Sequence, residues 1–124
     1  MALTAQMFNQ IMKGLKSDNG SRPNEQRTNP RVGVHGRADI RTLPFPPAGG
    51  RKVSVWVRDL SIDGVGILHS VALPEGTRFV LTYHQPGGKD LNVVYIVAHT
   101  AQVSKGLFGI GARVFGTGVK IDAA

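Results

Sequence analysis

Residues 53–70 read VSVWVRDLSIDGVGILHS and carry the clearest strand pattern in the chain. Valine occupies every second position of 53–57, and a period of two is typical of a strand with one buried face. The apolar run at 65–70 predicts another strand. A polar stretch at 59–64 lies between them, so this part of the sequence predicts two consecutive strands joined by a short connection.

Short β runs separated by Gly and Pro continue on both sides of this region. QPGG at 85–88 supplies the turn residues of a hairpin, and TLPFPPAGG at 42–50 is typical of a loop. We expect six strands, at 31–42, 51–58, 65–70, 77–83, 91–103 and 107–115. Because turn signals separate these strands and no second helix is indicated, the sequence predicts an all-β protein built on a six-stranded antiparallel β-barrel.

The N-terminal segment, residues 2–16, predicts one short amphipathic helix. Its apolar residues recur at four-residue spacing and two more widen the stripe: Leu3, Met7, Ile11 and Leu15, with Phe8 and Met12. Such a helix either packs on its own domain or docks a partner. Residues 17–30 contain no aliphatic or aromatic side chain, so we expect a flexible basic loop, then the barrel over 31–116 and a tail at 117–124.

Composition limits the class of protein. The chain has 124 residues, 41% of them hydrophobic, which allows one domain with a short appendage. The absence of cysteine excludes disulfides and Cys-based zinc modules. No apolar run approaches the roughly 18 residues of a transmembrane helix. The N-terminus lacks the pattern of a signal peptide, so we expect a cytoplasmic protein without membrane insertion.

The positive charge is concentrated in the first half of the chain. Residues 1–58 hold ten Lys and Arg against three Asp and Glu, whereas residues 59–124 hold five of each. The net charge of +7 therefore comes from the first half alone. A basic segment of this kind attracts phosphate in a nucleic acid, a nucleotide or an anionic lipid, and charge alone does not choose among them.

The polar stretch between the two central strands has more than one chemical interpretation. Asp59, Ser61 and Asp63 fit the first half of a calcium loop, but position twelve is Ser70 rather than a bidentate Glu, which disfavours calcium. A turn of this composition can also present a carboxylate and a hydroxyl to a ligand, and a carboxylate accepts N–H groups from a base edge. The structural alternative is a turn whose side chains satisfy their own backbone.

Two arginines upstream form a second motif. Arg27 and Arg31 lie four residues apart, and Pro30 biases the chain between them toward an extended conformation. In an extended chain such residues point to the same side, about 13 Å apart at about 3.3 Å per residue. Two guanidinium groups at this spacing can hold two parts of one dianionic ligand.

The combination Arg27-x-x-x-Arg31 with Asp59-x-Ser61-x-x-Gly64 resembles the paired motifs of the PilZ domain family. The resemblance implies a PilZ-type six-stranded barrel and, as ligand, the bacterial second messenger cyclic di-GMP. It implies that Arg27 and Arg31 contact guanine and phosphate. It also implies that Asp59 and Ser61 bind the guanine edge and a nearby phosphate. Gly64 would give the turn its backbone freedom.

The resemblance covers about residues 26–116, and FGIGARVF at 108–115 is similar to the closing strand of the family. Gln26 stands where members often carry an Arg or an aliphatic residue, so one or two ligand molecules per chain both stay open. The implied function is a non-enzymatic receptor that orders its loop at 17–31 on binding. The receptor would then signal to a downstream protein partner in motility, pilus, polysaccharide or virulence output.

Other sites receive little support from the sequence. The four histidines form no HxxxH or HxH pair, so we expect no metal. Ser61 has no nearby His to serve as a base, so we expect no catalytic residue, no cofactor and no enzyme. The rival function is a small basic β-barrel that binds RNA or single-stranded DNA. Such proteins stack bases on exposed aromatics, whereas we expect Trp56 and Phe79 in the core or at its rim.

Overall fold

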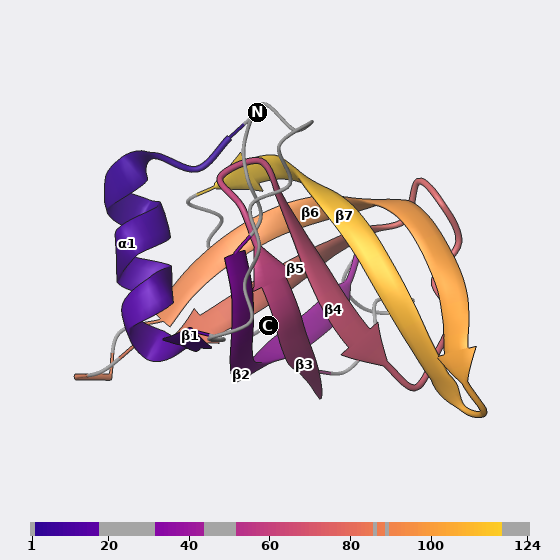
Figure 1. The fold of residues 1–124 in the computed structure, drawn as a ribbon. Helices are drawn as coiled ribbons and strands as arrows, with labels where there is room; N and C mark the ends of the chain where they lie inside the picture. Colours follow the sequence, from indigo (N-terminus) through magenta and orange to yellow (C-terminus); the bar gives the residue numbers. More distant parts are fainter. Residues whose placement is uncertain (1, 18–31, 44–51, 86, 89, 118–124) are drawn as a thin grey trace.

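The computed structural model describes residues 2–17, 32–43, 52–85, 87–88 and 90–117. In these described residues, one helix precedes seven strands (Figure 1): α1 (Ala5–Gly14), β1 (Lys16–Ser17), β2 (Val32–Thr42), β3 (Val53–Leu60), β4 (Gly64–His69), β5 (Arg78–His84), β6 (Asp90–Ser104) and β7 (Leu107–Thr117). The six expected strands are confirmed, each with ends within two residues of the expected ones.

Six of the strands close into an antiparallel barrel. The order of pairing is β2-β3-β4-β7-β6-β5, and β5 pairs with β2 to complete the circle. The strand β1 was not expected, and it places Ser17 in the sheet rather than in the predicted loop. It pairs with β2 through Ser17 and Val34, at the end of β2 that β5 does not reach.

The interior of the barrel is filled by aliphatic and aromatic side chains from all six strands. Phe79 and Tyr95 stack with ring centroids 5.7 Å apart, and the prediction that Phe79 belongs to the core is confirmed. The buried hydroxyls of Tyr83 and Tyr95 lie 2.6 Å apart and share a hydrogen bond. This pairing gives each phenol a partner in a place that water does not reach.

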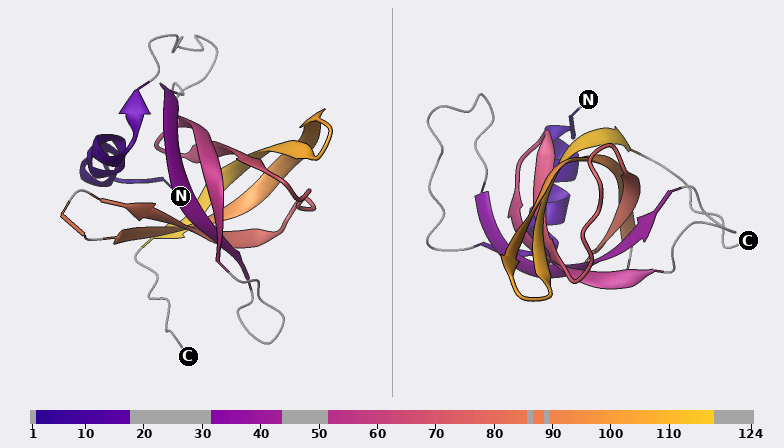
Figure 2. Two further views of the ribbon diagram at one scale, coloured as in Figure 1. Left: turned by 90° about the horizontal axis from the view of Figure 1, so that it is seen from below. Right: turned by 90° about the vertical axis from the view of Figure 1, so that its right-hand side faces the viewer.

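The helix α1 lies at one end of the barrel and covers its core (Figure 2). Its apolar stripe faces the barrel: Leu3, Ile11 and Leu15 are buried, and Met7, Phe8 and Met12 pack against the core. Of the two expected roles for this helix, the structure therefore shows packing on its own domain. At the C-terminal end, a Cβ on Gly14 would lie only 2.7 Å from the carbonyl oxygen of His84, so glycine permits the close approach of helix and strand.

The helix is shorter than the expected range of 2–16 because its ends are capped. The hydroxyl of Thr4 accepts a hydrogen bond from the N–H of Met7, which satisfies one of the free donors of the first turn. Leu15 is already extended. The rest of the expected loop, from residue 18 to 30, and the tail from 118 onward lie outside the described residues. Within the described part of the chain, no helix is long and apolar enough to cross a membrane.

Candidate functional site

The structure brings three of the five predicted ligand-binding residues together. Asp59 is the next-to-last residue of β3, Ser61 follows the end of that strand, and Gly64 begins β4. The other two, Arg27 and Arg31, lie outside the described residues. The described part of the candidate site is therefore centred on the β3–β4 connection.

The connection is a tight turn that satisfies its own polar groups. The N–H of Ser61 donates to the carbonyl oxygen of Gly64 at 3.0 Å. The hydroxyl of Ser61 is buried and donates to Oδ1 of Asp63 at 2.6 Å. In this state the Ser61 side chain serves the turn, as the structural alternative predicts, and its contact with a ligand stays a prediction. Gly64 does not use the positive-φ region that only glycine adopts easily.

Two backbone hydrogen bonds from distant segments hold the turn in place. The N–H of Leu3, just before α1, donates to the carbonyl oxygen of Ile62 at 2.6 Å. The N–H of Val114, in β7, donates to the carbonyl oxygen of Asp63 at 2.9 Å. The turn is thus fixed between the N-terminal segment and the last strand of the barrel.

A β-bulge directs both Arg58 and Asp59 to the outer face of the barrel. Val57 pairs with Ile67 and Asp59 pairs with Gly66, so Arg58 is an extra residue without a partner position in β4. Val57 is buried, whereas Arg58 is exposed and Asp59 is half-buried. The Nε of Arg58 lies 3.7 Å from Oδ2 of Asp59. Bulges commonly re-aim side chains next to binding sites.

Glycines form the floor beside this ion pair. Gly66 in β4 pairs directly with Gly111 in β7. The carboxylate of Asp59 covers Gly66 so closely that a Cβ there has no room, and the ring of His99 covers Gly111 in the same way. Asp59, Gly66, Gly111 and His99 consequently form one row across β3, β4, β7 and β6.

Gly109, two residues before Gly111 in β7, is covered less closely. A Cβ on Gly109 would lie 3.2 Å from Cγ1 of Val103 and at ordinary contact distance, 3.5 Å, from a terminal nitrogen of Arg58. Gly109 and Gly111 face the same side of the strand, about 7 Å apart at about 3.4 Å per residue. We call this surface the glycine floor, defined by Gly66, Gly109 and Gly111 with Arg58, Asp59 and His99 above it.

A positively charged aromatic surface adjoins the floor. Trp56 is 48% exposed and lies on the outer face of β3 between the buried Val55 and Val57, so the expectation that it belongs to the core or its rim is wrong. The guanidinium of Arg37 lies 4.6 Å from the centre of its ring, and the Nε of Arg37 donates to Oγ of Ser54 at 2.8 Å. A hollow of about 270 Å³ is lined by side chains on this side, Trp56 and Arg58 among them. The surface combines a planar apolar group with two cations.

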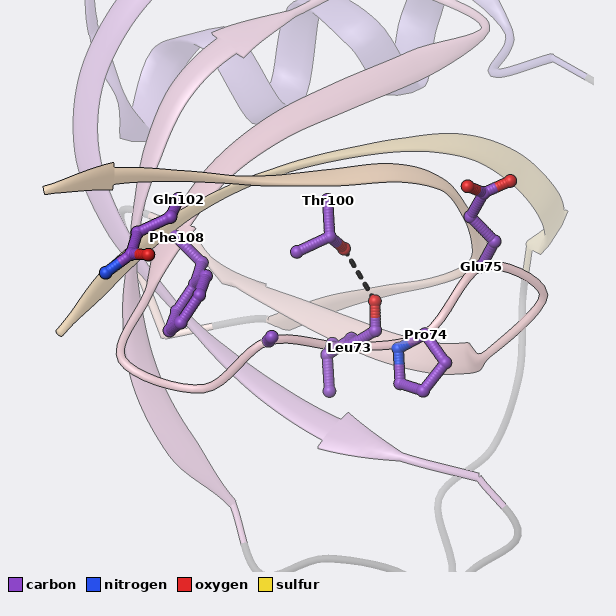
Figure 3. A pocket seen from close by; sticks show the side chains of 7 residues that line it. Leu73, Pro74, Glu75, Thr100, Gln102 and Phe108 are labelled. Carbon is purple, nitrogen blue, oxygen red and sulfur yellow. Dashed lines mark hydrogen bonds between the residues drawn. The ribbon is translucent and has the colours of Figure 1, made fainter. Parts of the chain in front are cut away.

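A separate hollow of about 400 Å³ lies between the segment before β5 and the β6–β7 strands (Figure 3). It is lined by Leu73, Glu75, Thr100 and Phe108 among others, and the hydroxyl of Thr100 donates to the carbonyl oxygen of Leu73 at 2.5 Å. Among the described residues that line this hollow there is no cation, and the single charged side chain is that of Glu75. It is therefore less suited to a phosphate-bearing ligand than the glycine floor.

Titratable groups elsewhere have structural partners. Burial lowers the pKa of His69, whose Nδ1 accepts a hydrogen bond from the N–H of Ser70. His84 lies between Asp90 and Asp39, at 2.9 and 2.7 Å, and these hydrogen bonds raise its pKa. Among the residues that the structure describes, no group of three or more His, Asp or Glu side chains is arranged to hold a metal ion.

Sequence reasoning missed the contributions of Arg58, His99 and the glycines of the floor. A glycine inside a strand pattern marks a place where another group approaches the backbone closely, and Gly66 and Gly111 carry that signal. Their partners were not visible, because the pairing of β4 with β7 joins residues that are 45 positions apart in the chain. Comparison with protein-family models gives no match, and comparison with curated proteins gives none either.

Proposed function

We propose that this protein is a non-enzymatic receptor for cyclic di-GMP of the PilZ type. Its ligand would bind on the outer face of the barrel at the β3–β4 connection. The closed six-stranded barrel and the position of Asp59 on that face support the proposal. On binding, the arginine-bearing loop folds over the ligand and alters the surface presented to a downstream protein partner.

The observation that carries the proposal is the register between β2 and β3. Gly33 pairs directly with Asp59. Arg31 is two residues from Gly33 in the chain, so at most about 7 Å of backbone separates it from the position opposite the carboxylate. Arg27 is six residues away, within about 22 Å of extended chain. The two motifs, far apart in sequence, are thus within reach of one ligand.

The chemistry of these groups matches a guanine dinucleotide. The carboxylate of Asp59 accepts the N–H donors of a guanine edge, while arginine matches guanine O6 and N7 or a phosphate with two parallel hydrogen bonds. Arg58 adds a further cation beside the carboxylate. Each good bidentate contact contributes about 1–3 kcal/mol of base discrimination, so losing either motif arginine lowers affinity at least about fivefold.

The residues on either side of the segment 18–31 support a switch. Ser17 in β1 pairs with Val34 in β2, so the described residues that flank this segment belong to neighbouring strands. A ligand that contacts this segment stabilises one arrangement of it in proportion to its differential affinity. We therefore expect NMR relaxation of residues 18–31 to change when the ligand saturates the protein.

Calorimetric titration with cyclic di-GMP tests the proposal. We expect micromolar or tighter binding to the wild type, and its loss in an Arg27→Ala/Arg31→Ala variant. An Arg78→Ala variant controls for the general loss of positive charge, because Arg78 belongs to β5. The stoichiometry resolves the question raised by Gln26. Absence of binding at high ligand concentration overturns the proposal.

A second function is favoured by one specific observation, the exposed Trp56 beneath Arg37. Proteins that bind single-stranded nucleic acid stack bases on such aromatics in a basic surface. Trp56 is the single tryptophan of the chain, so its fluorescence reports directly on stacking. Quenching by oligonucleotides of any sequence, with a steep salt dependence, favours this rival. Quenching by cyclic di-GMP alone argues against it.

A further inference from the structure

His99 lies at the candidate site although no motif contains it. Its imidazole covers Gly111, and the carboxylate of Asp59 covers Gly66. Since Gly66 and Gly111 are direct partners, the two groups lie above neighbouring backbone positions, whose Cα atoms are about 5 Å apart in an antiparallel pair. His99 comes from β6 and Asp59 from β3, so the fold brings together two residues forty positions apart.

His99 is accessible to a ligand. Three atoms of its imidazole, Cε1, Nε2 and Nδ1, lie within 3 Å of the place where a Cβ on Gly111 would stand, and the residue as a whole is exposed. An exposed ring held close to the backbone in this way can be reached by a second planar group. Arg58 provides a second planar group at Gly109. Base stacking on aromatic side chains and on guanidinium planes is a general mode of nucleotide recognition.

We propose that His99 is the stacking platform for a guanine base, with the hydrogen-bonding edge of the base directed toward Asp59 and Arg58 placed against the attached phosphate. This inference rests on the proposed function and extends it to the residue that selects for a planar base. The carboxylate accepts the N–H groups of guanine, whereas the corresponding edge of adenine presents a ring acceptor at N1. The site therefore takes a guanine nucleotide in preference to an adenine one, with the choice between the bases made by the carboxylate and the stacking supplied by His99.

The alternative is that His99 only fills space above Gly111. The two roles predict different effects of His99→Ala and His99→Phe on ligand affinity. A stacking platform is retained in His99→Phe and lost in His99→Ala, because stacking requires the ring and not its nitrogen atoms. A space-filling role affects the stability of the free protein and leaves ligand affinity unchanged in both variants.

The experiment is calorimetric titration of cyclic di-GMP into the full chain and three variants: His99→Ala, His99→Phe and, as a matched control, Lys105→Ala on the exposed β6–β7 turn. We expect about a tenfold loss of affinity in His99→Ala, within the range of a lost base stack, and affinity within about twofold of wild type in the other two. In the wild type, the Hε1 resonance of His99 shifts upfield on saturation, as ring stacking requires. Cyclic di-AMP, as the comparison ligand, binds at least about tenfold more weakly.

The outcomes separate the two proposals. If the wild type binds and Asp59→Asn abolishes binding while His99→Ala leaves it unchanged, the platform is wrong and the receptor proposal stands. Equal losses in His99→Ala and His99→Phe likewise overturn stacking, since the ring alone then does not suffice. If the wild type does not bind at all, the proposed function fails and the platform fails with it.

Discussion

Replacing Gly66 by alanine tests whether the Asp59 carboxylate rests on the glycine floor. Alanine in a strand interior is favoured over glycine by roughly 0.5–1 kcal/mol, because glycine loses more conformational entropy on folding. Against this gain, the new Cβ displaces the carboxylate. An off-rotamer side chain costs about 0.5–1.5 kcal/mol, and the exposed ion pair with Arg58 contributes at most about 1 kcal/mol. We expect Gly66→Ala to lower the free energy of unfolding by about 0.5–1 kcal/mol.

The same substitution has the opposite sign when Asp59 is absent. In an Asp59→Ala background nothing remains to be displaced, so Gly66→Ala raises the free energy of unfolding by about 0.5–1 kcal/mol. The coupling energy between the two positions is therefore about 1–2 kcal/mol, measured by urea unfolding of the four proteins in the cycle. Gly116→Ala is the control, because a Cβ there meets no atom within 4 Å. We expect the coupling energy between this substitution and Asp59→Ala to be near zero. A coupling below about 0.5 kcal/mol for Gly66, the limit of simple additivity, refutes the contact.

Three further predictions concern the barrel and its turn. Ile11→Ala opens a cavity between α1 and the core and lowers the free energy of unfolding in urea by about 2–5 kcal/mol. Ser61→Ala removes the hydrogen bond to Asp63 in the turn and lowers the free energy of unfolding by about 1 kcal/mol. An unchanged free energy of unfolding would mean that this bond does not stabilise the turn. Hydrogen bonds to Asp90 and then to Asp39 raise the pKa of His84 in the folded protein. The protonated ring therefore contributes its full stabilisation at pH values below the ordinary pKa of 6.5, and this contribution is lost as pH rises through the higher folded-state pKa. Urea unfolding of the wild type and of His84→Gln at a series of pH values tests this prediction. The variant is expected to lack the part of the pH dependence of the free energy of unfolding that comes from His84.

The strands and the helix could be predicted because their signals are local. Alternation at 53–57 and the turn residues at 85–88 are properties of neighbouring residues, and the structure confirms both elements. The strand β1 has only two residues, too few for any periodicity, and it exists because Ser17 pairs with Val34. Its formation depends on a contact across a long connection, which no local pattern records.

The site was predicted in part, for the same reason. The polar stretch between two apolar runs predicted Asp59 in the connection after the strand, whereas the structure has it as the next-to-last residue of β3. The bulge at Arg58 was not foreseen, because an extra residue is defined only by the register with the partner strand. The turn that contains the buried Ser61 is likewise held by backbone hydrogen bonds from Leu3 and Val114, which are distant in the sequence.

The hydrogen bond from Leu3 to Ile62 has a practical consequence for anyone who handles this protein. An affinity tag or fluorescent fusion joined ahead of Leu3 begins at the residue that fastens the β3–β4 turn. Crowding there strains the turn and the helix together, because Leu3 is also buried in the core. We therefore expect a tag at this position to lower the free energy of unfolding, and its proteolytic removal to restore the value of the untagged protein.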